Sequence, residues 1–436
     1  MLKHVPWRGL RARVVLIGWA LAFIAFVPAP APAGTALDER VLGKARDYLY
    51  NYVSWELEAI LFKIRQAHSS LAPFTTETER ARFVIRYLDA VKRADELNGQ
   101  IDRVFADPNQ PDKTQAFQLT VVRDAVVSSI KQYQPLAETI IEGQIGAVLR
   151  DEGFAVLGEV IPPVSARITD LPMLLVISPR NVIRRDLAIN LINLTPDQMA
   201  ALEAEIDHDF GVSSLVVPIG GLALYPSMVI RSGHAPYLYE TIAHEWAHHY
   251  LLLFPLGFEY LNTGSETWII NETVASVFGR EIGRKTIERF YADFPEVLRL
   301  LPASQSPRLP RSASVTPTPS DPPRFNAGAV MNETRVRADQ LLAEGKIEEA
   351  EAYLEQQRRL FAANGYVYRK MNQAFFAFYG GYQAPDGSGA GGQDPIGPAV
   401  SALREGHPSI KAWMETVRGI TSRTALLEAV QMISRK

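Results

Sequence analysis

Apolar residues in the first third of the chain repeat with the spacing of a helix. Between residues 37 and 158 they recur every three or four positions, for example at Val41, Ala45, Tyr48, Tyr52, Leu57, Ile60, Leu61 and Ile64. Residues with this period share one helix face, which can pack against a core. Prolines and polar residues at 107–112 interrupt the pattern and indicate a loop. We therefore predict a helical region over residues 34–158.

The pattern changes near residue 160 to short apolar runs. Residues 174–178 form such a run, ended by a proline, and this predicts a strand. Thr195 is followed by Pro196 and Gln198, the pattern of an N-cap, a first-turn proline and a capping-box partner. We expect the helix that begins there to end at Gly211.

Two further apolar runs, at 215–218 and 222–230, are separated by Gly220 and Gly221. They predict a strand pair joined across the glycines. Pro218 indicates an edge position, because proline cannot donate a ladder hydrogen bond. Short mixed strands before a long helix indicate an α+β core over residues 159–300, in a chain that is predominantly helical.

The last third of the chain begins with a stretch rich in Pro, Ser and Thr. These residues bury little apolar surface, so we expect a disordered loop or linker over 301–326. Residues 329–363 predict a helical hairpin that turns at Gly345, and 385–398 predict a glycine-rich loop. A C-terminal helical region over 327–436 is completed by helices expected at 399–403, 410–417 and 424–433.

The N-terminal segment has the pattern of a targeting sequence. Basic residues precede an apolar run at 14–27, and small residues and prolines follow. The run is shorter than the ~20 residues that span a bilayer, and Ala31-Pro32-Ala33 offers a cleavage site. We expect residues 1–33 to be a signal peptide or, alternatively, an N-terminal membrane anchor. Either reading places the remaining chain outside the cytoplasm, secreted or anchored to the membrane.

The composition excludes several kinds of binding site and catalytic group. The 436 residues carry a formal net charge of -3, and this balance gives no reason to expect a nucleic-acid partner. There are no cysteines, which excludes disulfides, thiolate metal sites and cysteine nucleophiles. Any metal must therefore be held by His, Asp or Glu.

The pattern with the clearest chemistry is His244-Glu245-Trp246-Ala247-His248, in an apolar helix expected between Pro236 and Pro255. Residues four apart share a helix face, so His244 and His248 can direct their imidazoles at one metal ion. Glu245 lies one residue further round and can reach a water on that metal. In this arrangement two nitrogens bind zinc and the carboxylate accepts the proton of the water, whose pKa zinc lowers toward ~7.

Glu272 is the expected third metal ligand. It lies on a predicted helix that Ser265 can cap, close beside an apolar face. A carboxylate there would be costly to bury without a cation. Glu266 and Glu281 are rival ligands. His249 points about 100° away from His248 on the helix, so it is expected to be packed or exposed rather than a ligand.

The segment from His244 to His248, followed by Asn271-Glu272, resembles the gluzincin metallopeptidases, the thermolysin-like and aminopeptidase-like zincins. The resemblance covers a small part of the chain. It implies a zincin-like catalytic core with an active-site helix, zinc held by His244, His248 and Glu272, and an edge strand that binds peptide. It also implies hydrolysis by a water that zinc activates.

The sequence departs from this family at one position. Thermolysin-like enzymes carry an acid four residues after the ligand Glu, where it orients the first His, and this chain has Ser276 there. A metal-bound His usually needs such a partner. Glu240, Glu281 or a backbone carbonyl is expected to serve His244 instead.

Peptide hydrolysis also needs a hydrogen-bond donor for the developing oxyanion. Tyr379 and Tyr382 are the candidates, because Gly380 and Gly381 let the backbone approach a ligand. Packing or surface exposure is the alternative role for both tyrosines. Arg369 is a further candidate, for holding a substrate carboxylate.

Together these patterns predict zinc-dependent hydrolysis of peptides or unfolded protein segments outside the cytoplasm, with Glu245 as the catalytic base. Two alternatives stay open. The first is a zinc-binding protein without hydrolysis that recognises a partner through a degenerate peptidase cleft. The second is a helical envelope protein whose histidines are incidental.

Overall fold

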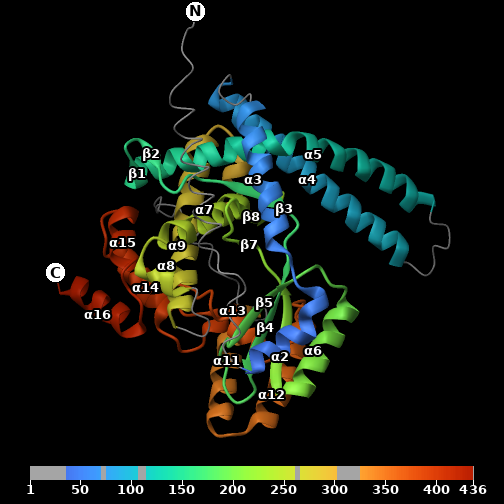
Figure 1. Cartoon of the computed structure of the whole chain (residues 1–436), viewed down its shortest axis with the longest axis vertical. Coiled ribbons are helices and arrows are strands. Elements are labelled where there is room, and N and C mark those ends of the chain that lie inside the picture. The colour runs from blue at the N-terminus through green and yellow to red at the C-terminus, as the bar shows by residue number, and fades with distance from the viewer. Residues whose placement is uncertain (1–35, 70–74, 107–113, 261–265, 302–324, 436) are drawn as a thin grey trace, which may run out of the picture.

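The computed structural model is predominantly helical with small sheets, as the α+β expectation requires (Figure 1). It describes residues 36–69, 75–106, 114–260, 266–301 and 325–435. The expected signal segment, the loop at 107–112, the cap at Ser265 and most of the linker at 301–326 lie outside the described residues. Within the described ranges, no helix combines the length and apolar character needed to cross a bilayer.

The N-terminal helices confirm the helical periodicity. After α2 (Ala36–Ala45) and a 3-10 turn (Arg46–Tyr48) come α3 (Tyr52–Ser69), α4 (Glu77–Ala106) and α5 (Thr114–Leu149). Helices α4 and α5 form a long hairpin that projects to the right in Figure 1. Its apolar faces contribute Val84, Leu88, Val91, Ile141 and Ile145 to the largest core.

Two helices at the centre of this core carry the candidate chemistry. They are α7 (Ala235–Leu251) and α9 (Glu266–Phe290), linked through α8 (Pro255–Tyr260) and followed by α10 (Pro295–Leu298). Glycines on α9 allow a close crossing: a Cβ at Gly279 would lie 2.7 Å from Glu240 O and 3.0 Å from His244 Cβ. The crossing therefore brings His244 directly against α9.

A three-stranded sheet with the order β5-β4-β6 lies in the lower half of Figure 1. Strands β4 (Met173–Pro179), β5 (Leu187–Leu191) and β6 (Val212–Pro218) pair antiparallel. Alternate residues face opposite sides. Leu175 and Ile177 pack with α2 and α6 (Pro196–Phe210), whereas Val176 packs with α11 (Ala327–Ala343), α12 (Ile347–Ala363) and α13 (Gln373–Tyr379).

The expected strand pair across Gly220 and Gly221 is wrong. Residues of the first run form β6, which pairs with β4, whereas β8 (Ser227–Ile230) pairs with β3 (Ala166–Thr169) and β7 (Gly221–Leu222). The two runs prefer partners from earlier in the chain, which local patterning does not reveal. Pro218 is confirmed on an edge strand, and β7 forms the edge of the second sheet, β3-β8-β7.

Several local signals are confirmed. Helix α6 has the capping box of Thr195 and Gln198, and Gly211 ends it with a left-handed backbone. Helices α11 and α12 form the expected hairpin, with Gly345 at a φ of 74°. The glycine-rich stretch is not all loop, since it contains a 3-10 turn (Gly389–Gly391) and the start of a helix. The C-terminal helices are α14 (Ile396–Glu405), α15 (Ile410–Val417) and α16 (Arg423–Ser434).

Two short features join the helical and sheet parts. A π-helical turn (Arg150–Phe154) ends α5 and leads into the small hairpin of β1 (Ala155–Val156) and β2 (Glu159–Val160). Packing mixes the expected regions, because α2 from the first region covers the sheet of the second. The division of the chain at residues 158 and 300 stays a prediction.

Candidate metal centre

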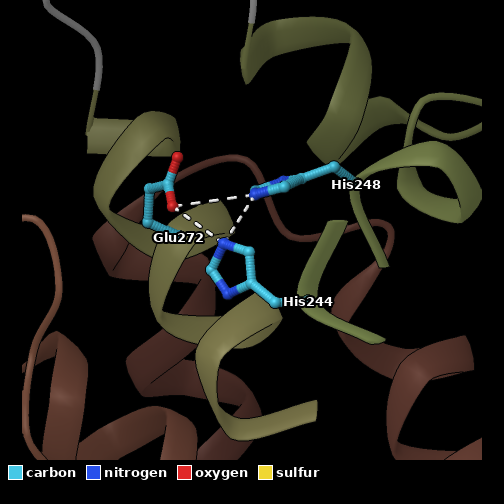
Figure 2. Close-up of side chains that lie close together, drawn as sticks. All are labelled: His244, His248 and Glu272. Carbon is cyan, nitrogen blue, oxygen red and sulfur yellow. Dashed lines mark hydrogen bonds and ion pairs between the residues drawn. The ribbon is translucent and has the colours of Figure 1, made fainter. Parts of the chain in front are cut away.

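Helices α7 and α9 bring three predicted ligands together. His244 and His248 lie one turn apart on α7, and Glu272 faces them from α9, with all three side chains pointing toward one another (Figure 2). The two His Nε2 atoms are 3.0 Å apart. Glu272 Oε2 lies 3.4 Å from His244 Nε2 and 3.6 Å from His248 Nε2. The three donor atoms thus surround one small volume.

The donor set could hold a metal ion such as zinc. Glu272 is 3% exposed, and its Oε2 has no hydrogen-bond partner. Leaving a buried carboxylate oxygen without a partner costs free energy, which a cation among the three donors would remove. Two imidazole nitrogens and one carboxylate oxygen match a three-ligand zinc site that keeps a position open. In the described residues this is the single group of three such side chains with converging donors.

Asn271 orients His248. The Nδ1–H of His248 donates to Asn271 Oδ1 at 2.7 Å, and Asn271 Nδ2 in turn donates to the carbonyl oxygen of Leu256 at 3.3 Å. The second bond fixes which end of the amide faces the imidazole. A proton held on Nδ1 leaves the lone pair of Nε2 directed at the cluster, as a metal ligand requires.

Tyr260 positions Glu272. Its hydroxyl donates to Glu272 Oε1 at 2.7 Å, and its ring lies 5.1 Å from the ring of His248. One carboxylate oxygen is therefore held by the phenol while the other turns toward the histidines. The end of α8 and the middle of α9 are joined at the site by this bond.

His244 has a weaker partner than His248. Ser276 Oγ lies 3.5 Å from His244 Nδ1, which is long for a hydrogen bond. Glu281 does not take the orienting role, because it binds Arg404 at 2.8 Å and Lys285 at 3.1 Å. The position at which the family has an acid is thus the position that contacts His244, through a hydroxyl in place of a carboxylate.

Glu245 is buried beside the cluster. Burial, reinforced by the negative charge of Glu272 and opposed by His248, raises its pKa to about 8. A Cβ at Gly221 would collide with the Glu245 carboxylate, so the absence of a side chain on β7 makes room for it. The expected base therefore lies against the edge strand of the β3-β8-β7 sheet, where an extended chain can pair.

The electrostatics of the cluster favour positive charge. Burial lowers the pKa of His248, but the charge of Glu272 outweighs it and brings the pKa to about 9. Burial opposes ionisation of Glu272, yet the two histidines hold its pKa well below the ordinary value. His249 differs, because burial lowers its pKa to about 4 while its Nε2 lies 2.8 Å from the carbonyl of Leu224. It is packed, as expected.

The two candidate tyrosines have different surroundings. The pKa of Tyr382 is raised well above the ordinary value by desolvation of its hydroxyl and by the charges of Glu272 and Glu245, although 43% of the residue as a whole is exposed. Tyr379 instead packs on Phe375, with ring centroids 4.6 Å apart, and neither carboxylate acts noticeably on it. The structure brings Tyr382 toward the site and leaves Tyr379 in an aromatic cluster.

Other candidates lie elsewhere. Glu266 is paired with Arg423, so it is not part of the ligand group. Arg369 binds both oxygens of Glu203, at 2.5 and 2.8 Å, and thereby ties the start of α13 to α6 rather than facing the site. It does not serve as a carboxylate-binding group for the metal centre.

Sequence reasoning missed four residues around the centre: Asn271, Tyr260, Gly221 and Arg185. Asn271 carried a signal, since it directly precedes the third ligand. Tyr260 carried none, because its contact depends on the turn through α8. Arg185 lies in the loop between β4 and β5, far from the motif in sequence, and stacks on Trp268 with 3.7 Å from its guanidinium carbon to the ring centroid.

Known proteins add no further identification. Comparison with protein-family models, with curated proteins and with solved structures found no match. The resemblance to gluzincins therefore stands on the residues of α7 and α9 alone.

Proposed function

We propose that this protein is a zinc-dependent hydrolase of peptide bonds that acts outside the cytoplasm. The observation that carries the proposal is the convergence of His244, His248 and the unpartnered oxygen of Glu272, with the buried carboxylate of Glu245 beside them. Bound by these three ligands, zinc would act as a Lewis acid toward a water molecule and the substrate carbonyl.

The protein's own residues would then handle the proton and the developing charge. Glu245 accepts the proton of the attacking water, whose oxygen bonds to the carbonyl carbon. The C–N bond breaks, and the same proton passes from Glu245 to the leaving amine. We propose Tyr382 as the hydrogen-bond donor to the developing oxyanion, because the charges of Glu272 and Glu245 act on its hydroxyl. Burial raises the pKa of Glu245 to about 8 in the protein without metal, and a zinc ion beside the carboxylate would lower it and so favour the ionised form that accepts a proton.

The substrate class follows from the edge strand. In the described part of the chain, β7 is bonded to β8 on one side and ends the sheet on the other. An extended peptide can add to such an edge through main-chain hydrogen bonds. Folded proteins rarely offer a free extended segment, so we propose peptides or unfolded segments as substrates.

Zinc content of residues 34–436, purified without a metal-affinity step, tests the proposal. We expect about one zinc per chain in the parent, and loss of that zinc in His248→Ala and Glu272→Ala. His208→Ala is the matched control, because His208 is exposed on α6 and should leave zinc content unchanged. A folded parent without zinc would contradict the proposal.

Glu245→Gln separates hydrolysis from metal binding. We expect this variant to keep its zinc and to lose about 100- to 10,000-fold in turnover of a quenched fluorescent peptide panel. Zinc in the parent without turnover on the panel would favour the alternative, a zinc-binding protein that recognises a partner.

A further inference from the structure

A cavity of about 250 Å³ lies against the first turn of α9, the helix that carries Glu272. Its wall is formed by the loop between β4 and β5, the first turn of α9 and the segment that follows α13. The proposed binding site in this cavity consists of Arg185 and Trp268. Trp268 links the cavity to the centre, because its ring lies 6.3 Å from that of Tyr382 and its helix carries Glu272.

Four arginines line this cavity, and three of them have carboxylate partners. Arg184 pairs with Asp186 at 2.5 Å, Arg335 with Asp339 at 2.7 Å and Arg423 with Asp394 at 2.8 Å. Arg185 has no ion pair with any described carboxylate, and its Nε is buried without a hydrogen-bond partner. A guanidinium is always charged and presents donors in a planar fork. Arg185 thus holds unused capacity to bind an anion.

The guanidinium of Arg185 is held in place by stacking. It lies over the ring of Trp268, which is 4% exposed. A Cβ at Gly381 would collide with the same ring, so the indole is fixed by the backbone after α13. Stacking occupies one face of the guanidinium, and Nε on its edge has no hydrogen-bond partner. The edge is the part of a guanidinium that binds a carboxylate through two parallel hydrogen bonds.

The position of Arg185 relates it to the reacting groups. Burial lowers its pKa, and Tyr260, Glu272 and Tyr382 are the groups whose charges act on it in the opposite direction. The geometry agrees, because Arg185 stacks on Trp268, which lies one turn before Glu272 on α9 and has its ring 6.3 Å from that of Tyr382. The C-terminal carboxylate is the anion that every unmodified peptide substrate brings to such a guanidinium.

We propose that Arg185 binds the free C-terminal carboxylate of the substrate, so that the enzyme cleaves near the carboxyl end of peptides. This inference rests on the proposed function for the reaction itself, but it concerns a separate group and a separate contact. Trp268 is the positioning residue, because it acts through the guanidinium.

The test compares one pool of dye-labelled hexapeptides, made either with free C-terminal carboxylates or with C-terminal amides. Affinity is measured by fluorescence anisotropy on zinc-loaded protein in the Glu245→Gln background, which prevents turnover. We expect the free acids to bind about tenfold or more tightly than the amides, because the guanidinium contributes a charge-assisted bond only to the acid. Arg185→Ala should bring the two affinities together.

Arg184→Ala is the matched control. Arg184 is the neighbouring residue in the same loop and is exposed and already paired with Asp186, so its loss should leave the preference for the acid intact. Circular dichroism and the melting temperature show whether each variant is folded. Arg185→Lys should restore part of the preference, since it returns the charge without the planar fork.

The possible failures are distinguishable. Equal affinity for acid and amide in the parent, including no detectable binding of either, overturns the inference, as does a preference that survives Arg185→Ala. Zinc content is measured on the same samples. One zinc per chain with equal affinities would leave the proposed hydrolase standing without a carboxylate site, whereas absence of zinc would remove the hydrolase itself.

Discussion

Two groups of buried carboxylates in the described part of the chain are balanced in opposite ways. The first joins α3, α5 and β3. Glu138 Oε2 accepts from Lys63 at 2.8 Å, and its Oε1 accepts from Gln134, from Arg167 and from the backbone of Ile168. Glu142, one turn later, also binds Lys63 at 2.8 Å. Both oxygens of Glu138 thus have partners from the protein.

The second group is the candidate metal centre, where Glu272 has histidines as its ion-pair partners in place of Lys or Arg. Glu272 and Glu245 are both buried, no Lys or Arg in the described ranges forms an ion pair with either, and Glu272 Oε2 has no hydrogen-bond partner. Buried charge is ordinarily paired or coordinated to a metal. The first group therefore shows how this protein satisfies a carboxylate for stability. In the second, the two histidines are the only ion-pair partners of Glu272 among the described residues, and imidazoles are neutral when they bind a metal, so a metal-bound site would take its positive charge from the ion.

Breaking the first group should have the largest effect on stability. Glu138→Ala leaves Lys63 and Arg167 at a buried site without their main counter-charge, so we expect a loss of about 3–5 kcal/mol in the free energy of unfolding. Denaturant titration followed by circular dichroism measures it. The same loss should be found with and without zinc. A loss below about 1 kcal/mol would show that the network is not closed as described.

The second group should respond to zinc instead. At a free zinc concentration 100 times the Kd, the parent should gain about 2.7 kcal/mol in unfolding free energy, and a chelator should remove the gain. Glu272→Ala should show no gain, whereas Glu138→Ala should keep it. Equal stabilisation of the parent and Glu272→Ala would mean that zinc binds at some other place.

The sequence predicts features that depend on nearby residues better than features that depend on distant ones. Spacing within one helix predicted that His244 and His248 converge, and capping residues predicted the bounds of α6, because both depend on neighbours within a few positions. The pairing of β6 and β8 depends on β4 and β3, from elsewhere in the chain, and was predicted wrongly. Local patterns carry little information on which distant strand is the better partner.

The sequence likewise predicted only part of the candidate site. Glu272 could be singled out, because a carboxylate beside an apolar helix face needs a cation. Tyr260 and Arg185 could not, since the bond of Tyr260 to Glu272 and the stacking of Arg185 on Trp268 exist only after α8 and the β4–β5 loop have folded onto α9. Glu281, one of the residues expected to orient His244, binds Arg404 and Lys285 instead. The side chain that contacts His244 Nδ1 is Ser276, at the position where thermolysin-like enzymes carry the orienting acid.

A smaller effect is expected from the residue that orients His248. Asn271→Ala removes the acceptor of the Nδ1–H while leaving all three ligands, so we expect zinc affinity to fall by about 10- to 100-fold. Competition with a chromophoric chelator measures the affinity. Ser276→Ala is the comparison, and its effect should be less because the contact with His244 is 3.5 Å long. The reverse order would show that His244 depends more on its partner than the geometry indicates.

The smallest effect on stability should come from Glu281 on α9, which is partly buried and paired with two cations. Burial raises its pKa, but hydrogen bonds from Arg404 and Lys285 outweigh this and hold the pKa below its ordinary value of 4.5. A depressed pKa in the folded state means that the contribution to stability is complete above 4.5 and is lost as the pH falls through the folded pKa.

We expect Glu281→Gln to lower the unfolding free energy by about 1 kcal/mol at pH 7, because the pair is partly screened by solvent. The difference from the parent should shrink as the pH falls below 4.5, measured on zinc-free samples so that acid release of the metal plays no part. A difference that grew in acid would mean that Glu281 prefers its protonated form in the folded state, and that its two cations do not balance it as Lys63 and Arg167 balance Glu138.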